Sequence, residues 1–309
     1  MAHIAKKGKI NRGDLIFYSL LMIWPLLQFT VFYIYVNFNS ILLAFSKYVG
    51  KTRILSFSNL SANIKEFISS VNTGGNNYLG AALSRSVLGW LITTGISLPL
   101  GLFFSHYIGR KMFGAGFFRI ILFLPSVISI LVLVYIYNIF VTDALPAILK
   151  DFFNITIENP LDPTKGSAFS LILVFKIFIG FGTAVLMFSN SVSSIPPETI
   201  EAGKIDGTSA MQEFWHIVFP NLYSTMTVFV ITSVANILLD QFDVFSFYGW
   251  HPGDKVITIG YLFFVKSTNP DEVALYPAIA SFGVLLTLIA VPTTFIVKYC
   301  LEKFGPSED

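Results

Sequence analysis

The chain has 309 residues, of which 54% are hydrophobic and only 12% are charged. Soluble domains carry about a quarter charged residues, so this composition, with 32 phenylalanines and a mean hydropathy of +0.70, predicts a protein whose solvent is lipid. The net charge of +2 excludes the basic surface that nucleic-acid binding requires. The single cysteine, Cys300, excludes an intrachain disulfide and a metal site built from several cysteines.

Six apolar stretches are long enough to cross a bilayer as helices, which takes about 20 residues. They cover 15–36, 86–107, 117–141, 169–188, 219–239 and 274–299. Because backbone polar groups cannot stay unpaired in lipid, each stretch must be helical. The first is too long for the apolar part of a signal peptide and no cleavage site follows it, so we expect a retained span. The sequence therefore predicts an all-α integral membrane protein with six transmembrane helices.

Basic residues predict the orientation of these spans. Lys6, Lys7, Lys9 and Arg12 precede the first span, and Arg110, Lys111 and Arg119 lie in or just beyond the short second loop. Cytoplasmic loops carry an excess of Lys and Arg, so we expect both termini in the cytoplasm. The predicted plan is a cytoplasmic tail at 1–14, a first span at 15–36, an extracytoplasmic loop at 37–85, a transmembrane domain at 86–300 and a cytoplasmic tail at 301–309.

The inner segment 189–220, between the fourth and fifth spans, carries local signals for a helix–turn–helix. In chain order these are an N-cap at Ser194, Pro196 and Pro197 in a first turn, a helix to about Ile205, a turn at Asp206-Gly207, a capping box of Ser209 and Gln212, a second short helix to about Val218, and Pro220 at the return to the membrane. These features alone fit an ordinary amphipathic interfacial loop equally well.

The identity and spacing of the residues in this segment are more specific than its helix and turn signals. E-A-G-K-I-D-G-T, with a Phe, an Ile and a Pro at fixed distances behind it, resembles the E-A-A motif of permease subunits of binding-protein-dependent ABC importers, in the version of the maltose-like sugar permeases. The motif positions are Glu201, Ala202, Gly203, Asp206, Gly207, Phe214, Ile217 and Pro220. The resemblance covers roughly residues 80–300. Gly203 replaces the usual second Ala, and Phe219 replaces the Leu before the proline.

The resemblance implies a multi-pass permease in a bacterial cytoplasmic membrane, with 189–220 as a coupling helix that docks on an ATPase. It implies three kinds of partner: an extracytoplasmic sugar-binding protein, a second permease of different sequence, and two ATPase subunits that hold ATP and Mg²⁺. We expect no cofactor, metal or catalytic residue on this chain. Gly50-Lys51-Thr52 lacks the upstream glycine of a phosphate loop, so ATP must be hydrolysed elsewhere.

Polar residues inside or beside the spans are the candidates for the substrate path. Lys176 lies inside the fourth span, where an ammonium group is costly; it either meets an acidic or phosphorylated sugar group or extends to the headgroups. A polar run among aromatics follows the fifth span, and it suits either sugar recognition or a solvated helix exit. The run comprises Asn236, Asp240, Gln241 and Asp243, and weaker candidates in the third span are Tyr135 and Asn138.

Three alternatives remain open at the level of sequence. A secondary transporter would be expected to show inverted repeats or paired broken helices, and we identify neither. A membrane-embedded enzyme would need a catalytic constellation, and none is recognisable. An ABC permease for another small solute would share the coupling motif, but the sugar-type Ile-Pro and Asp-Gly-Thr pattern and the long first outer loop disfavour it. Uptake of labelled solutes would separate it from a sugar permease.

Overall fold

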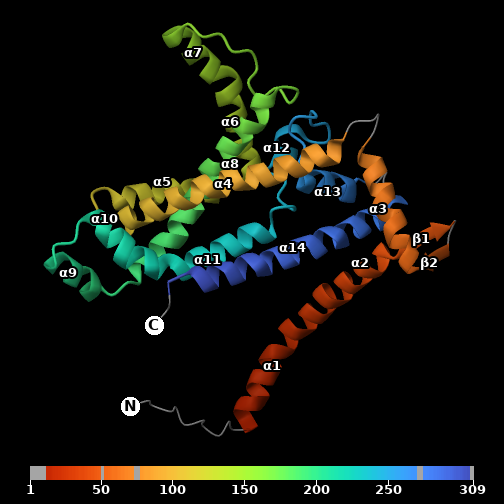
Figure 1. Ribbon diagram of the computed structural model, residues 1–309, viewed down its shortest axis with the longest axis horizontal. Coiled ribbons are helices and arrows are strands. Elements are labelled where there is room, and N and C mark those ends of the chain that lie inside the picture. The colour runs from red at the N-terminus through yellow and green to blue at the C-terminus, as the bar shows by residue number, and fades with distance from the viewer. Residues whose placement is uncertain (1–11, 50–51, 73–76, 270–273, 307–309) are drawn as a thin grey trace. The chain divides into compact units, whose positions relative to one another are not determined.

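The computed structural model describes residues 12–49, 52–72, 77–269 and 274–306 (Figure 1). The basic tail residues Lys6, Lys7 and Lys9, and Gly50-Lys51, lie outside the described residues. The chain divides into two compact units. One unit comprises residues 1–67 and 273–284, and the other comprises residues 68–272 and 285–309.

Within the described residues, six helices are long and apolar enough to cross a membrane. They are Ile16–Ala44, Tyr78–Gly109, Ile130–Phe153, Gly166–Ser193, Ala210–Ala235 and Tyr276–Phe304. This confirms the predicted all-α membrane fold with six spans. A shorter apolar helix, Ala115–Val127, adds a seventh hydrophobic segment.

In the first unit, one long helical run leads into a small hairpin and a further helix. The elements are α1 (Arg12–Gln28), the π-helical η1 (Phe29–Tyr35), α2 (Val36–Ala44), β1 (Ser46–Val49), β2 (Thr52–Leu55) and α3 (Phe57–Val71). The two strands are antiparallel, with Ser46 opposite Leu55. The buried Asn63 amide on α3 donates to Ala44 O (3.1 Å) and Ser46 O (3.0 Å), so it ties α3 to the junction between α2 and the hairpin.

The second unit is built around two long helices, α4 (Tyr78–Gly109) and α8 (Gly166–Ser193). Small residues let them approach closely: a Cβ on Gly101 would lie 3.1 Å from the Ala184 methyl. Such small-residue contacts are typical of helix packing in membranes. The helix α5 (Ala115–Val127) also packs against α8, because a Cβ on Gly182 would collide with the carbonyl oxygen of Leu122.

The third span is not the single helix that we predicted over 117–141. α5 ends at Val127, Ile128 and Ser129 are extended, and a new run begins at residue 130, where the ribbon changes direction (Figure 1). The new run comprises α6 (Ile130–Ile139), the π-helical η2 (Phe140–Ala144) and α7 (Leu145–Phe153). Pro125 lacks an N–H group, so it weakens the last turn of α5. The Ser129 carbonyl accepts from Val132 N–H and Leu133 N–H, and these are the first hydrogen bonds of the next helix. The prediction of a continuous helix was wrong because the apolar pattern continues through the break.

The fifth span begins earlier than predicted. Its run comprises α10 (Ala210–Glu213), the π-helical η3 (Phe214–Val218) and α11 (Phe219–Ala235). The second short helix therefore does not stop before Pro220. A proline cannot donate a backbone hydrogen bond, and the wider π-turn, in which Phe219 N–H donates to Phe214 O, carries the helix past it. The remaining elements are α9 (Pro197–Ile205), α12 (Val244–Tyr248), α13 (Ile259–Thr268) and α14 (Tyr276–Phe304).

Candidate functional site

Residues 197–220, which we call the E-A-G segment, fold as the predicted helix–turn–helix. α9 ends at Ile205, and Gly207 follows with φ +76°, the left-handed conformation that glycine adopts readily. The Ser209 hydroxyl accepts from Gln212 N–H (3.3 Å), and the Gln212 side chain accepts from Ser209 N–H (2.9 Å). Both halves of the predicted capping box are thus present.

The N-cap that we predicted at Ser194 was wrong. Ser194 is the C-cap of α8, where its hydroxyl donates to Ser191 O at 2.7 Å. α9 begins at Pro197, and its N-cap residue, Pro196, has no side chain that can accept a hydrogen bond. Because the Ser194 hydroxyl bonds to a carbonyl of the preceding helix, it ends α8 and does not cap the start of α9.

The motif residues of the E-A-G segment divide by exposure. On the surface lie Glu201, Ala202, Asp206, Gly207 and Pro220, whereas Gly203 and Phe214 are buried and Ile217 is half-buried. The exposed members leave one face of α9 and its turn open to another molecule. Of the members that face inward, Phe214 packs on α4, whereas Gly203 and Ile217 contact each other within the segment.

Gly203 is where α9 meets the next helix. A Cβ on this glycine would lie 2.8 Å from Ile217 Cδ1 and 3.2 Å from the Thr208 hydroxyl. That hydroxyl donates to Gly203 O at 2.7 Å. The departure from the usual Ala therefore allows a tighter fold of the segment upon itself.

Phe214 anchors the segment in an aromatic socket on α4. Its ring stacks on Phe103 with centroids 4.8 Å apart and meets the His106 ring edge-on at 5.5 Å. Its neighbour Glu213 is only 1% exposed and forms an ion pair with Arg110 at 2.7 Å. Phe214 was identified from the sequence as a motif position, whereas Glu213 was not among the predicted residues. The available signal was an acidic residue beside apolar anchors, opposite a basic short loop.

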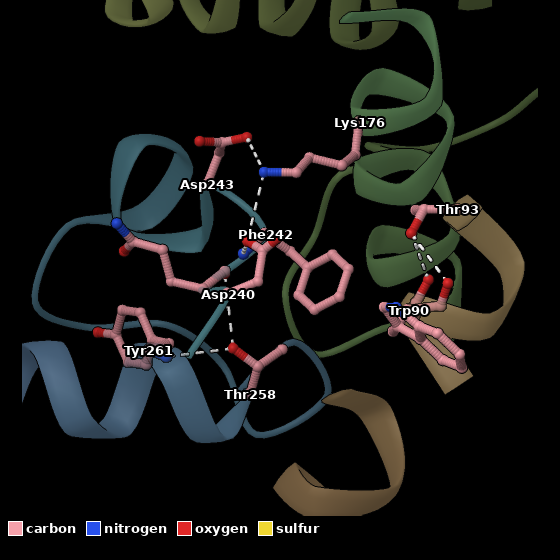
Figure 2. A network of polar contacts seen from close by, with 10 residues as sticks. Trp90, Thr93, Lys176, Asp240, Phe242, Asp243, Thr258 and Tyr261 are labelled. Atoms are coloured by element: carbon pink, nitrogen blue, oxygen red, sulfur yellow. Dashed lines mark hydrogen bonds and ion pairs between the residues drawn. The ribbon is translucent and has the colours of Figure 1, made fainter. Parts of the chain in front are cut away.

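A second group of polar residues lies between α8 and the chain after α11 (Figure 2). Lys176 Nζ lies 3.3 Å from both Asp240 Oδ1 and Asp243 Oδ2, and we call these three residues the polar cluster. The ammonium group also lies 6.0 Å from the centre of the Phe242 ring. Lys176 is thus paired within the chain, an arrangement that neither of our readings of this residue included. One ammonium against two carboxylates gives the cluster a formal charge of −1.

The backbone of the polar cluster adopts an unusual conformation. Phe242 and Asp243 have φ values of +55° and +58°, a region that bulky side chains rarely occupy. Asp240 Oδ1 accepts from Phe242 N–H at 2.8 Å, and the Phe242 ring is buried against Gly89, whose Cβ would lie 3.0 Å from it. Such conformations persist only where the surroundings fix them, and they concentrate at functional sites.

The start of α4 and the chain leading into α13 support the cluster. Ile259 N–H donates to the Ser86 hydroxyl (2.9 Å), and Arg85 donates to Ile257 O (3.1 Å). Thr258 caps α13 by accepting from Tyr261 N–H at 3.2 Å (Figure 2). A Cβ on Gly260 would collide with the backbone of Asp240. The segment that presents the two aspartates is therefore packed from both sides.

Two phenols, of the half-buried Tyr248 and the buried Tyr261, brace the same region. Burial raises the pKa of Tyr248 and that of Tyr261 to about 12. Both phenols therefore stay protonated and donate hydrogen bonds, Tyr248 to Leu161 O (2.8 Å) and Tyr261 to Gly249 O (2.9 Å). These bonds tie the chain after α11 to the loop before α8 and to the end of α12.

The structure brings together only part of the predicted substrate-path set. Lys176, Asp240 and Asp243 meet, and the Gln241 side-chain oxygen is buried beside them without a hydrogen-bond partner among the described residues. The other three predicted residues form none of the hydrogen bonds and ion pairs found in the cluster among the described residues: Asn236, Tyr135 and Asn138. The Asn236 amide instead donates to Thr232 O one turn earlier. The Tyr135 side chain is 67% exposed.

Comparison with known proteins places the chain in a family. Residues 97–304 match the binding-protein-dependent transport system inner membrane component family. The chain is 24% identical to the multiple sugar-binding transport system permease protein MsmF of Streptococcus mutans, over 90% of this chain and 92% of that protein. It is 33% identical to the osmoprotective compounds uptake permease protein GgtC of Synechocystis, over 56% of this chain and 64% of that protein.

The fold has a solved counterpart. A chain from the crystal structure of a bacterial ABC transporter involved in the import of the acidic polysaccharide alginate superposes with a TM-score of 0.75. The alignment covers 96% of this chain and 98% of that chain at 15% identity, which supports the fold alone. With more than half of its length matched, this chain belongs to the family of inner membrane components of binding-protein-dependent transport systems.

Proposed function

We propose that this chain is a membrane-spanning subunit of an ATP-driven importer that takes up a sugar or oligosaccharide delivered by an extracytoplasmic binding protein. The observation that carries the proposal is the E-A-G segment, whose exposed face bears Glu201 and Ala202 and whose buried face is fixed to α4. The names of relatives such as MsmF support sugar as the substrate class.

In this proposal the exposed face of α9 docks on a separate ATPase subunit in the cytoplasm. The two ATPase subunits hold ATP and Mg²⁺, and this chain performs no chemistry. A second permease of different sequence completes the path, and both termini of this chain face the cytoplasm. ATP binding needs only to favour one of two conformations of the membrane helices. A segment that is rigidly joined to the spans is sufficient to transmit the movement of the ATPase subunits to them.

The polar cluster is the proposed contact with substrate. Carboxylate oxygens accept hydrogen bonds from sugar hydroxyls, and the Lys176, Asp240 and Asp243 side chains are 29%, 34% and 20% exposed. Because Lys176 already faces two carboxylates, the cluster repels rather than attracts an anionic group. The charge balance therefore favours a neutral, polyhydroxylated substrate over the acidic or phosphorylated sugar that Lys176 alone suggested.

A second candidate substrate is a small osmoprotective solute. The similarity to GgtC supports it, since that relative shares 33% identity with this chain over 187 residues. The same cluster would serve a neutral polyol. The family membership at the same time argues against the secondary-transporter alternative, because that class of protein needs no coupling segment.

ATP-dependent uptake into vesicles that carry the assembled transporter tests the proposal. We expect uptake of a labelled neutral oligosaccharide when its binding protein is supplied, and competition by other neutral saccharides. A uronic-acid oligosaccharide of equal length is the matched control, and it should compete poorly. Uptake of the acidic but not the neutral compound would overturn the proposed role of the cluster, and ATP-independent uptake would overturn the importer itself.

A further inference from the structure

One helix touches both functional regions of the second unit. α4 contains 32 residues, which corresponds to about 48 Å at 1.5 Å per residue. Near its start, Gly89 receives the Phe242 ring of the segment that presents the two aspartates. At its end, Arg110 and the Phe103 and His106 rings receive Glu213 and Phe214 of the E-A-G segment. In the ribbon, α10 lies near one end of α4 and α12 and α13 near the other (Figure 1).

The contact at the end of α4 is a buried ion pair. Glu213 Oε2 lies 2.7 Å from Arg110 Nη2, and the two side chains are 1% and 18% exposed. The second oxygen, Oε1, has no hydrogen-bond partner among the described residues. Apolar residues of similar volume often replace such a pair without loss of stability, so stability does not explain its presence. A short charge-assisted hydrogen bond instead fixes the orientation of Glu213 relative to the end of α4.

The backbone explains why a fixed orientation matters at this place. The E-A-G segment contains η3, a π-helical stretch at Phe214–Val218 that leads directly into α11. π-helical turns are rare, occur mostly as single turns inside α-helices, and are frequent at functional sites. If α9, α10 and the turn between them were held only by their chain connections to α8 and α11, they could pivot against the spans. Glu213 lies directly before η3 and Phe214 begins it, so their contacts with α4 block that pivot.

We propose that the Arg110–Glu213 pair and the Phe214 socket form a clamp that makes the E-A-G segment move as one body with α4. α4 then carries a displacement of the segment to Phe242 and the two aspartates that flank it. Arg110 and Glu213 are in this account positioning residues, which act through α4 and touch neither substrate nor nucleotide. The inference rests on the proposed function, since it assumes that an ATPase displaces the segment.

A double-mutant cycle in the reconstituted importer tests the clamp. The variants are Arg110→Gln, Glu213→Gln and the double variant, and the readout is substrate transported per ATP hydrolysed. Loss of coupling between two sites is expected to lower this ratio by about tenfold, within the usual range of coupling energies. Because each single variant leaves one unpaired buried group, the double variant should assemble at least as well as either, yet remain uncoupled.

The matched control is Glu302→Gln. Glu302 pairs with Lys298 at 3.6 Å, but both side chains are about half exposed, at 58% and 48%. A surface pair of this kind contributes little, so the ratio should equal that of wild type. A double variant that assembles and transports at the wild-type ratio overturns the clamp. A wild-type complex that hydrolyses no ATP overturns the proposed function, and the clamp with it.

A second measurement keeps the wild-type pair intact and does not depend on how the variants fold. Spin labels are attached to cysteines at two exposed positions, Met112→Cys and Met211→Cys. Met112 lies two residues beyond Arg110, and Met211 lies two residues before Glu213. The exposed Cys300 is changed to Ser to leave only these two labels. The clamp predicts the same distance between labels in the ATP-free and ATP-bound complex. A distance that changes between these states overturns the inference even if every Arg110 and Glu213 variant misfolds.

Discussion

The E-A-G segment and the polar cluster place their charges in opposite ways. In the segment most motif residues are exposed, and one ion pair, Arg110–Glu213, is buried. In the cluster all three charged side chains are partly buried, and the ammonium group of Lys176 in α8 neutralises one of the two carboxylates that follow α11. In our proposal a protein surface contacts the exposed side chains of the segment, and the substrate contacts the charged side chains of the cluster. On that proposal, coupling and selection depend on different physical interactions in the same chain.

The largest expected effect comes from Lys176→Met. This change leaves two carboxylates close together without their counter-ion, so one of them must take up a proton or water must enter. We expect transport to fall by at least about tenfold, because removing one partner of a buried pair costs several kcal/mol before solvent screening is counted. The rate of uptake of the labelled sugar, at a saturating concentration of the binding protein, measures this fall in transport.

A charge-neutral variant separates folding from selection at the same cluster. Lys176→Met with Asp240→Asn and Asp243→Asn has no unpaired charge, so assembly should return while sugar uptake stays low. If this triple variant transports the neutral sugar as wild type does, the cluster is a structural ion-pair network and the proposed substrate contact is contradicted.

The smallest expected effect comes from Gly203→Ala, which restores the usual residue of the motif. Ala gains up to about 1 kcal/mol of helix propensity over Gly, but its methyl would lie 2.8 Å from Ile217 Cδ1. Because that atom is the end of a flexible side chain, the two effects should nearly cancel. We expect the melting temperature of the complex and its ATPase activity to change little.

Gly203→Leu is the control for this position. Its larger side chain cannot fit beside Ile217 and Thr208, so α9 should separate from η3 and ATPase activity should become uncoupled from transport. A large effect of Ala would show that the tight contact at Gly203 is itself required, and that the exposed face of α9 depends on it.

Local signals in the sequence predicted local structure well. Hydropathy located six spans, and the Asp206-Gly207 turn and the Ser209–Gln212 capping box formed as expected because each depends on residues within a few positions. The same reasoning failed at Ile128–Ser129, where a break in geometry leaves the apolar pattern unchanged. It also failed at Ser194, whose hydroxyl had a nearer partner in α8.

Pairings between distant residues could not be predicted. Lys176 and Asp240 are 64 positions apart, and each was identified as a candidate for its own reason. Nothing in the pattern of either span shows that they meet. Glu213 was overlooked because a single acidic residue at a helix start normally faces solvent, and only the position of Arg110 at the end of α4 explains its burial.

Docking of an ATPase on the exposed face of α9 is the central claim, and copurification tests it most directly. The tagged chain is isolated in mild detergent as wild type, Glu201→Lys and Glu198→Lys. Both glutamates are exposed on α9, but only Glu201 is a motif position. The account predicts that an ATPase accompanies wild type and the Glu198 variant and is lost from the Glu201 variant. An ATPase retained by all three, or by none, would contradict it.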